Sequence, residues 1–188
     1  MKNISLVIDG GNFIHNGYGT AITTNRLISE NETLYIGPVK DILKKEIGIQ
    51  ELIILPVEPG DETGHIDGMV RFLDRETVVV SEYPEEYREG RKFMGNVAKM
   101  LKAEIKNEPL RVINSEPVEN NQRIGSAFGN YLNFLGVGNT IFLPQYGNDL
   151  DEQAQQVYEQ YAKVIPIERD IKKLSELGGV LNCITWNY

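Results

Sequence analysis

The single cysteine of this 188-residue chain, Cys183, is the first residue that could carry chemistry. A lone thiol cannot form an internal disulfide, so it is either a buried, inert apolar side chain or a reactive nucleophile. Two glycines, Gly178 and Gly179, precede it closely and let the backbone turn tightly near a ligand. The β-branched residues that follow predict a short strand at 180–185, with the sulfur at a strand end. Both interpretations stay open on this segment alone, because free cysteine is among the most buried residue types.

A second cluster combines an imidazole with a carboxylate, since His65 and Asp67 stand two residues apart in a glycine-flanked segment. In an extended backbone both side chains project from the same face. Such a pair suits an imidazole that acts as general acid and base beside a carboxylate that binds a cation. The alternative is a solvated acidic loop, because Glu58, Asp61 and Glu62 come shortly before the pair.

A third cluster, Asp9-Gly10-Gly11-Asn12, directly follows a strand-like run. This order puts a carboxylate at a strand end, where glycine backbone can approach a ligand closely. The alternative is ordinary turn chemistry, for which aspartate and glycine are both suited. The segment lacks the spacing of a dinucleotide-binding or phosphate-binding loop.

Composition narrows the class of protein and of ligand. With 27 acidic against 19 basic side chains the formal charge is −8, which disfavours nucleic acid and favours a cationic ligand. No apolar run approaches the roughly 18 residues of a membrane span, and the N-terminus lacks an apolar signal core, so we expect a cytoplasmic protein. One cysteine and two histidines give no zinc spacing, and the carboxylates form no calcium loop. We therefore expect no metal and no cofactor.

Three copies of one unit organise the chain, each predicted as strand, strand, helix, strand. The predicted hairpins pair 13–14 with 20–24, 69–73 with 77–81, and 131–135 with 140–144. The predicted helices are 39–47, 86–105 and 150–162, and the closing strands are 52–55, 110–113 and 164–167. Two further strands are predicted at 4–8 and 180–185. Because one such unit cannot bury its sheet alone, the units must stack, and we expect a single α/β domain over 1–188.

The order of the motifs resembles the C-terminal part of the agmatine deiminase and bacterial-type peptidylarginine deiminase family. The motifs are Asp-Gly-Gly-Asn-Phe at 9–13, Thr-Gly-His-Ile-Asp at 63–67, Tyr-Leu-Asn-Phe at 131–134, Leu-Pro-Gln-Tyr at 143–146 and Gly-Gly-Val-Leu-Asn-Cys-Ile-Thr at 178–185. That family belongs to the guanidine-modifying pentein superfamily, whose fold is a five-bladed ring of ββαβ modules. The resemblance implies a pentein-like chain of about three modules, incomplete relative to the five-module ring.

By this resemblance Cys183 is the nucleophile, His65 the general acid and base, Asp67 a guanidinium-binding carboxylate and Asp9 a further catalytic acidic residue. Residues implied to bind the substrate or support the site are Asn133, Gly11 and Asn12. The implied reaction is the cysteine-dependent hydrolytic deimination of a small cationic guanidine. The favoured substrate is agmatine, which would give N-carbamoylputrescine and ammonia in putrescine biosynthesis. A free or peptidyl arginine, which would give citrulline, is the next substrate.

Two departures from the family's pattern qualify these expectations. Relatives commonly have histidine directly before the nucleophile, where this chain has Asn182, which leaves the choice of substrate open. Family members are also nearly twice as long, and their N-terminal modules supply another guanidinium-binding carboxylate. We therefore expect a homo-oligomer, or a complex with a chain that supplies those modules. The alternative is a catalytically silent pentein fragment that acts as a binding or assembly module, and a structural repeat protein without a site is the least favoured.

Overall fold

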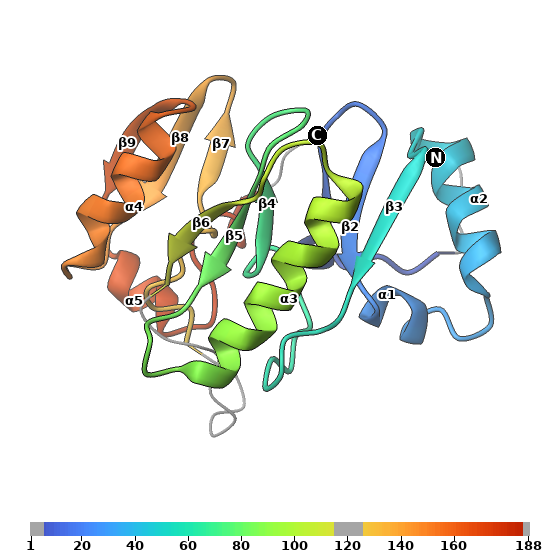
Figure 1. Cartoon of the computed structure of the whole chain (residues 1–188), viewed down its shortest axis with the longest axis horizontal. Helices are drawn as coiled ribbons and strands as arrows, with labels where there is room; N and C mark the ends of the chain where they lie inside the picture. Colours follow the sequence, from blue (N-terminus) through green and yellow to red (C-terminus); the bar gives the residue numbers. More distant parts are fainter. Residues whose placement is uncertain (1–5, 115–125, 186–188) are drawn as a thin grey trace.

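Each of the three predicted repeats folds as a separate three-stranded sheet with a helix packed beside it (Figure 1). The structure is a computed structural model that describes residues 6–114 and 126–185. In every sheet the first two strands form an antiparallel hairpin, and the closing strand pairs in parallel with the second strand. A parallel pair needs a long crossover connection, which a helix provides in each module. The three modules are thus true ββαβ units.

The element boundaries follow the predicted pattern closely. The first module contains η1 Gly10–Asn12, β1 Phe13–His15, β2 Thr20–Thr24, α1 Arg26–Ser29, α2 Ile36–Ile47 and β3 Glu51–Leu55. The second contains β4 Val70–Phe72, β5 Val78–Glu82, α3 Arg88–Glu104 and β6 Leu110–Ile113. The third contains β7 Leu135–Val137, β8 Thr140–Pro144, α4 Leu150–Glu159 and β9 Lys163–Ile167, and α5 Ile171–Ser175 follows it. The short elements η1, α1 and α5 were not predicted, because three to five residues are too few for a periodic pattern.

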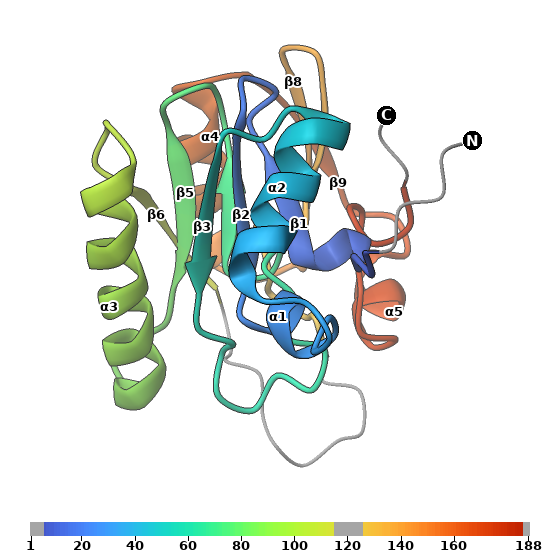
Figure 2. The same cartoon turned by 90° about the vertical axis from the view of Figure 1, so that its right-hand side faces the viewer.

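The modules stack because their central strands are buried on both faces. In β5, Val78 and Val80 belong to the core shared with the first module, whereas Val79 belongs to the core shared with the third. Helix α3 packs against β3 of the preceding module, and α4 packs against β6 in the same way. Seen from the side, α3 lies on one side of the sheets, and η1 and α5 lie on the other (Figure 2). Stacking therefore supplies the burial that one unit lacks.

Three of the predicted strands need correction. Residues 180–184 contain turns and no strand, because their backbone N–H groups bond to a side chain and not to a neighbouring strand. In the third module only Leu135 of the predicted strand 131–135 is in β7, and the residues before it form a buried turn. Of the predicted strand 4–8, residues 4 and 5 lie outside the described residues, and residues 6–8 form no strand.

A repeated feature of the modules is the stretch of chain that leads into the first strand of each. We call residues 9–12, 65–69 and 131–134 the lead segments, since they end where β1, β4 and β7 begin. Backbone bonds connect these segments to one another and to the chain after α5. The Asp67 N–H donates to the Gly11 carbonyl at 3.1 Å, and the Asn182 N–H donates to the Asn133 carbonyl at 3.3 Å. Every candidate residue from the sequence lies in a lead segment or in the turn 178–183.

Candidate active site

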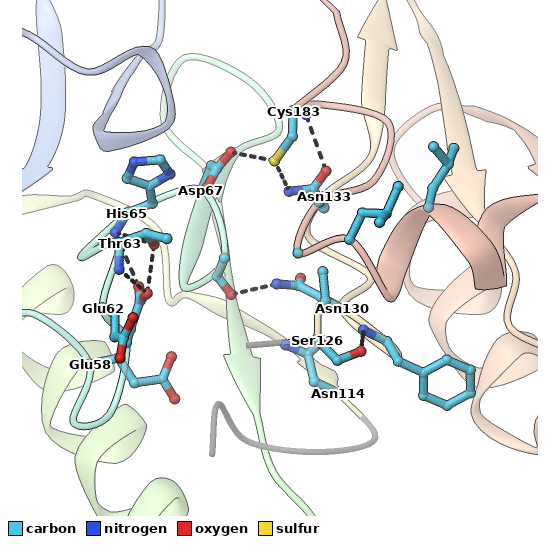
Figure 3. A pocket seen from close by; sticks show the side chains of 18 of the residues that line it. Glu58, Glu62, Thr63, His65, Asp67, Asn114, Ser126, Asn130, Asn133 and Cys183 are labelled. Atoms are coloured by element: carbon cyan, nitrogen blue, oxygen red, sulfur yellow. Dashed lines mark hydrogen bonds between the residues drawn. The ribbon is translucent and has the colours of Figure 1, made fainter. Parts of the chain in front are cut away.

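Four of the candidate side chains face one open cavity of about 420 Å³ at the meeting point of the second and third modules (Figure 3). His65 and Asp67 enter it from the second lead segment, and Cys183 enters from the C-terminal turn. Asn133, from the third lead segment, lies beside the sulfur. Residues more than a hundred positions apart in the sequence thus share one space of a size suited to a small ligand.

Asp9 reaches this group through His65 and is not part of the cavity wall. The Nε2 atom of His65 lies 2.9 Å from a carboxylate oxygen of Asp9. Partial burial would raise the pKa of Asp9, but the hydrogen bond and charge of His65, with help from the Gly11 N–H, bring it below its ordinary value. The carboxylate is therefore ionised at neutral pH, and its contact with Nε2 orients the imidazole ring.

The backbone around His65 is fixed by side chains that flank it. The carboxylate of Asp61 accepts hydrogen bonds from the N–H groups of Thr63 and His65, at 2.8 and 3.1 Å. The hydroxyl of Thr24, in β2, donates to the Gly64 carbonyl at 2.7 Å. Gly64 has a φ of +61°, a conformation that residues with a Cβ rarely adopt. These contacts hold the segment as a loop, and not in the extended backbone in which the side chains of residues 65 and 67 would share a face.

Gly11 and Asn12 support this loop and do not line the cavity. The Gly11 backbone lies so close to the imidazole of His65 that a Cβ atom would stand 2.4 Å from its Nδ1. Asn12 is buried, and its side-chain oxygen accepts from the N–H of Thr24 at 3.0 Å and lies 2.9 Å from the Thr24 hydroxyl oxygen. Both residues therefore act on the position of His65, a role that short sequence motifs do not reveal.

The turn that carries Cys183 is organised around the side chain of Asn133. Its Oδ1 atom accepts from the N–H groups of Val180, Asn182 and Cys183, at 3.2, 3.0 and 3.4 Å. Its Nδ2 atom donates to the Cys183 sulfur at 3.0 Å. One carboxamide thus satisfies backbone donors that a strand would pair with a neighbour, which is why the predicted strand at 180–185 is wrong. Cys183 itself is exposed.

Asp67 is the buried carboxylate of the site, with 3% of its surface exposed. One of its oxygens accepts from the Asn182 carboxamide at 2.7 Å and lies 3.8 Å from the Cys183 sulfur. Burial raises the pKa of Asp67 above its ordinary value, and the positive charge of Arg71 opposes that rise most strongly. The role of Asn182 as a hydrogen-bond partner of Asp67 was not predicted, because nothing in the sequence brings residues 115 positions apart together.

The thiol of Cys183 is mainly protonated at rest. Partial burial raises its pKa, the negative charge of Asp67 raises it further, and the hydrogen bond from Asn133 opposes the rise. A cation bound against Asp67 would cancel the repulsion between carboxylate and thiolate. The arrangement therefore couples binding of a cation to formation of the thiolate.

The cavity wall beyond His65 is acidic, as the composition suggested. Glu58 and Glu62 lie on the same side of the cavity as His65, facing Asn114 and Asn130 across it (Figure 3). Across residues 6–114 and 126–185, no group of three or more His, Cys, Asp or Glu side chains is arranged to hold a metal ion. Nor does any helix within those ranges have the length and apolar character needed to cross a membrane.

Comparison with known proteins identifies the family to which these features correspond. Residues 1–188 match the family model described as Porphyromonas-type peptidyl-arginine deiminase. An agmatine deiminase of Medicago truncatula is 27% identical over 218 residues, covering 96% of this chain and 56% of the relative. One of Pseudomonas fluorescens is 26% identical over 210 residues, with 95% and 56% covered. The chain thus spans little more than half the length of these relatives.

Solved structures give the same result for the fold. The agmatine deiminase of C. jejuni superimposes with a TM-score of 0.81 at 23% identity, covering 96% of this chain and 55% of that one. This similarity confirms the predicted pentein-like α/β fold, of which the described residues form three modules.

Proposed function

Because this chain belongs to the Porphyromonas-type peptidyl-arginine deiminase family, we propose that it carries the nucleophile side of a guanidine deiminase site. The observation that supports this most directly is the contact of the Cys183 sulfur with both Asn133 and the buried Asp67 carboxylate. The favoured substrate is agmatine, which would give N-carbamoylputrescine for putrescine biosynthesis in the cytoplasm. A free or peptidyl arginine, giving citrulline, is the second choice.

The proposed first half-reaction begins when a planar guanidinium binds against Asp67. The Cys183 thiol loses its proton to solvent as the cation binds, and the thiolate then adds to the guanidinium carbon and forms a C–S bond. Protonated His65, held by Asp9, gives a proton to one nitrogen, and the C–N bond to that nitrogen breaks to release ammonia. A cationic thiouronium adduct remains on the sulfur.

In the second half-reaction the neutral imidazole of His65 takes a proton from water. The resulting hydroxide adds to the adduct carbon, the C–S bond then breaks to return the thiolate, and the hydroxyl proton leaves to solvent to give the neutral ureido product. One imidazole thus acts as acid and then as base, and the balance of atoms needs only water. No cofactor is required.

Completion of the site is part of the proposal. A guanidinium is held by several charge-assisted hydrogen bonds, and Asp67 is the cavity carboxylate that contacts the Cys183 sulfur, whereas Glu58 and Glu62 lie on the side of His65. The relatives contain a further part that this chain does not match, about 44% of their length. We propose that a second polypeptide or a second copy of this chain supplies the remaining contacts. The same coverage supports the alternative of a silent fragment that only binds or assembles.

Turnover measurements separate these possibilities. Ammonia release from agmatine should be weak or undetectable for the purified chain and should appear when a polypeptide with the remaining modules of a relative is added. In that mixture Cys183→Ser should abolish release, and His65→Ala should slow it by about a hundredfold or more. Turnover that survives Cys183→Ser would contradict the proposed nucleophile.

Labelling tests the site without turnover. Chloroacetamidine, an amidinium that resembles the substrate, should alkylate Cys183 faster than iodoacetamide does at equal concentration. Equal and slow labelling that requires denaturant would instead support the silent fragment. Because the chain has one cysteine, mass spectrometry of the intact protein reads this reaction directly.

A further inference from the structure

Arg71 is a cation at an apolar interface that the proposed chemistry leaves unexplained. It lies in β4 opposite Val79 of β5, on the face of the second sheet that packs against the third module. Burial lowers the pKa of Arg71, and the nearby Asp67 carboxylate opposes that effect. Burial of a charged side chain costs free energy unless the charge is paired and hydrogen-bonded.

The contacts of Arg71 converge on the third lead segment. Its Nη1 atom donates to the backbone carbonyls of Leu132 and Phe134, each at 3.3 Å. Its guanidinium carbon lies 4.5 Å from the centre of the Phe134 ring. Leu132 and Phe134 flank Asn133, the residue whose carboxamide holds the nucleophile turn. Arg71 therefore hydrogen-bonds the backbone on both sides of Asn133, the residue that orients Cys183.

We propose that Arg71 is a positioning residue, which acts through Asn133 to hold the Cys183 sulfur and its turn in place. This inference rests on the proposed function, since it gives the orientation of Cys183 its purpose. The path runs from β4 of the second module through two carbonyls to Asn133, and from its carboxamide to the turn 178–183. Asp67 precedes Arg71 by four residues, so the same short stretch of chain positions both the carboxylate and the nucleophile.

The type of side chain matters for this role. A guanidinium is planar and always charged, and it can stack on an aromatic ring while its N–H groups reach two acceptors. A lysine ammonium at the same place keeps the charge but can neither stack in this way nor span both carbonyls with the same geometry. Arg71→Lys therefore separates position from charge, and it is also less disruptive to folding than removal of the cation.

The test is a cycle of variants read by alkylation of the single cysteine. The rate constant for iodoacetamide is measured from pH 6 to 10 for the wild type, Arg71→Lys, Asn133→Ala and the double variant. Arg71→Lys and Asn133→Ala should each raise the apparent pKa of Cys183 and slow alkylation at pH 7 by about tenfold, which corresponds to a shift of one pKa unit. The double variant should be no slower than Asn133→Ala, because both changes act on one path.

A matched control is Arg75→Met. Arg75 is exposed and also stacks on an aromatic ring, with its guanidinium carbon 5.1 Å from the centre of Tyr18, yet it makes no contact with the cavity. Its alkylation profile should stay within twofold of the wild type. This control separates loss of a stacked arginine elsewhere in the chain from loss of the contact to the third lead segment.

Three outcomes would overturn the inference. A folded Arg71→Lys variant with an unchanged alkylation profile would show that Cys183 does not depend on Arg71. Effects of Arg71→Lys and Asn133→Ala that multiply in the double variant would show independent roles. A failure of Arg71→Lys to fold, by circular dichroism, would show a purely structural role. Failure of the proposed function gives a different result. In that case the wild type itself, and not only the variants, would be unreactive toward chloroacetamidine.

Discussion

At the residue scale, the Asp67 carboxylate and the Cys183 thiol lie so close together that the charge of one affects the ionisation of the other. Each must lose a proton for the proposed chemistry. The negative charge of Asp67 raises the pKa of Cys183 across 3.8 Å, whereas the neutral thiol donates to Asp67 and lowers the pKa of that carboxyl. The pKa values of both groups stand above their ordinary values, with burial as the largest cause in each case. A cation bound between them would stabilise the ionised forms of both groups at once.

Substitution of Asp67 by Asn should therefore change two labelling rates in opposite directions. Loss of the negative charge lowers the pKa of Cys183, so neutral iodoacetamide should react several-fold faster at pH 7. Cationic chloroacetamidine should react more slowly, because the carboxylate that attracts it is gone. Asparagine keeps an acceptor for the Asn182 carboxamide, so the turn is preserved. Parallel changes in both rates would contradict the assigned role of Asp67.

Glu58 is a second buried carboxylate on the cavity wall, with 6% of its surface exposed. The hydroxyl of Tyr83, in the loop after β5, donates to it. Burial raises the pKa of Glu58 to about 7 from an ordinary 4.5, the charge of Asp61 adds to the rise, and the hydrogen bond from Tyr83 opposes it. The native state therefore holds this carboxyl protonated at pH values where the unfolded chain has already released the proton.

This difference predicts a specific loss of stability as pH rises. The contribution of Glu58 is fully present below pH 4.5 and is lost as pH rises through about 7, a change of about 3 kcal/mol in the free energy of unfolding. Glu58→Gln keeps an acceptor for Tyr83 and removes the titration, so the variant should gain stability relative to the wild type between pH 5 and 8. Calorimetry across this range measures the difference. The exposed Glu62→Gln is the control, and equal behaviour of the two variants would refute the prediction.

At the scale of elements, the lead segments, and not the strands of the stacked sheets, carry most of the side chains of the candidate site. Each ends at the first strand of a module, and backbone bonds connect the first to the second and the third to the turn 178–183. The sheets fix where these segments begin and end, and the segments contribute Asp9, His65, Asp67 and Asn133. The positions of these side chains are therefore fixed by irregular segments that are hydrogen-bonded to neighbouring segments and continue into rigid strands.

Gly179 tests how closely the turn 178–183 is packed. A Cβ atom on this residue would stand 2.8 Å from the Cβ and 3.2 Å from the sulfur of Cys183. Gly179→Ala must therefore move Cys183 away from Asn133, and we expect alkylation by chloroacetamidine to slow by about tenfold or more. Gly136→Ala is the matched control, because its added Cβ meets only the Phe134 ring at an ordinary 3.7 Å. Unchanged labelling in Gly179→Ala would mean that the turn adapts without cost.

The sequence predicted regular elements better than it predicted this irregular chain. Alternation and helical spacing depend on local burial, so the hairpins, helices and closing strands fall near their predicted places. The strand predicted at 180–185 is wrong because Asn133, some fifty residues away, supplies the partner for its backbone. The strand predicted at 131–135 is wrong because an apolar run can be a buried turn as well as a strand. Arg71 and Asn182 escaped notice, since their partners are distant in the sequence.

At the scale of the molecule, the three modules leave apolar side chains uncovered beside the cavity. Leu177 and Ile184 line it and expose 76% and 60% of their surfaces. Large apolar side chains beside a binding site are typical of surfaces that another chain covers. About 44% of the length of the Medicago truncatula relative lies outside its match with this chain. The same surface would serve a second copy of this chain.

Association should therefore depend on these side chains. Sedimentation velocity of the purified chain at micromolar concentration should show a dimer, or a complex when a polypeptide with the remaining modules of a relative is added. Leu177→Asp should weaken association by about tenfold or more, because it puts a charge into an apolar contact. Val137→Asp is the control, since Val137 is 54% exposed in β7 but does not line the cavity. A stable monomer with a cooperative melt, unchanged by the added polypeptide, would mean that the exposed leucine and isoleucine are simply solvated and that the three modules stand alone.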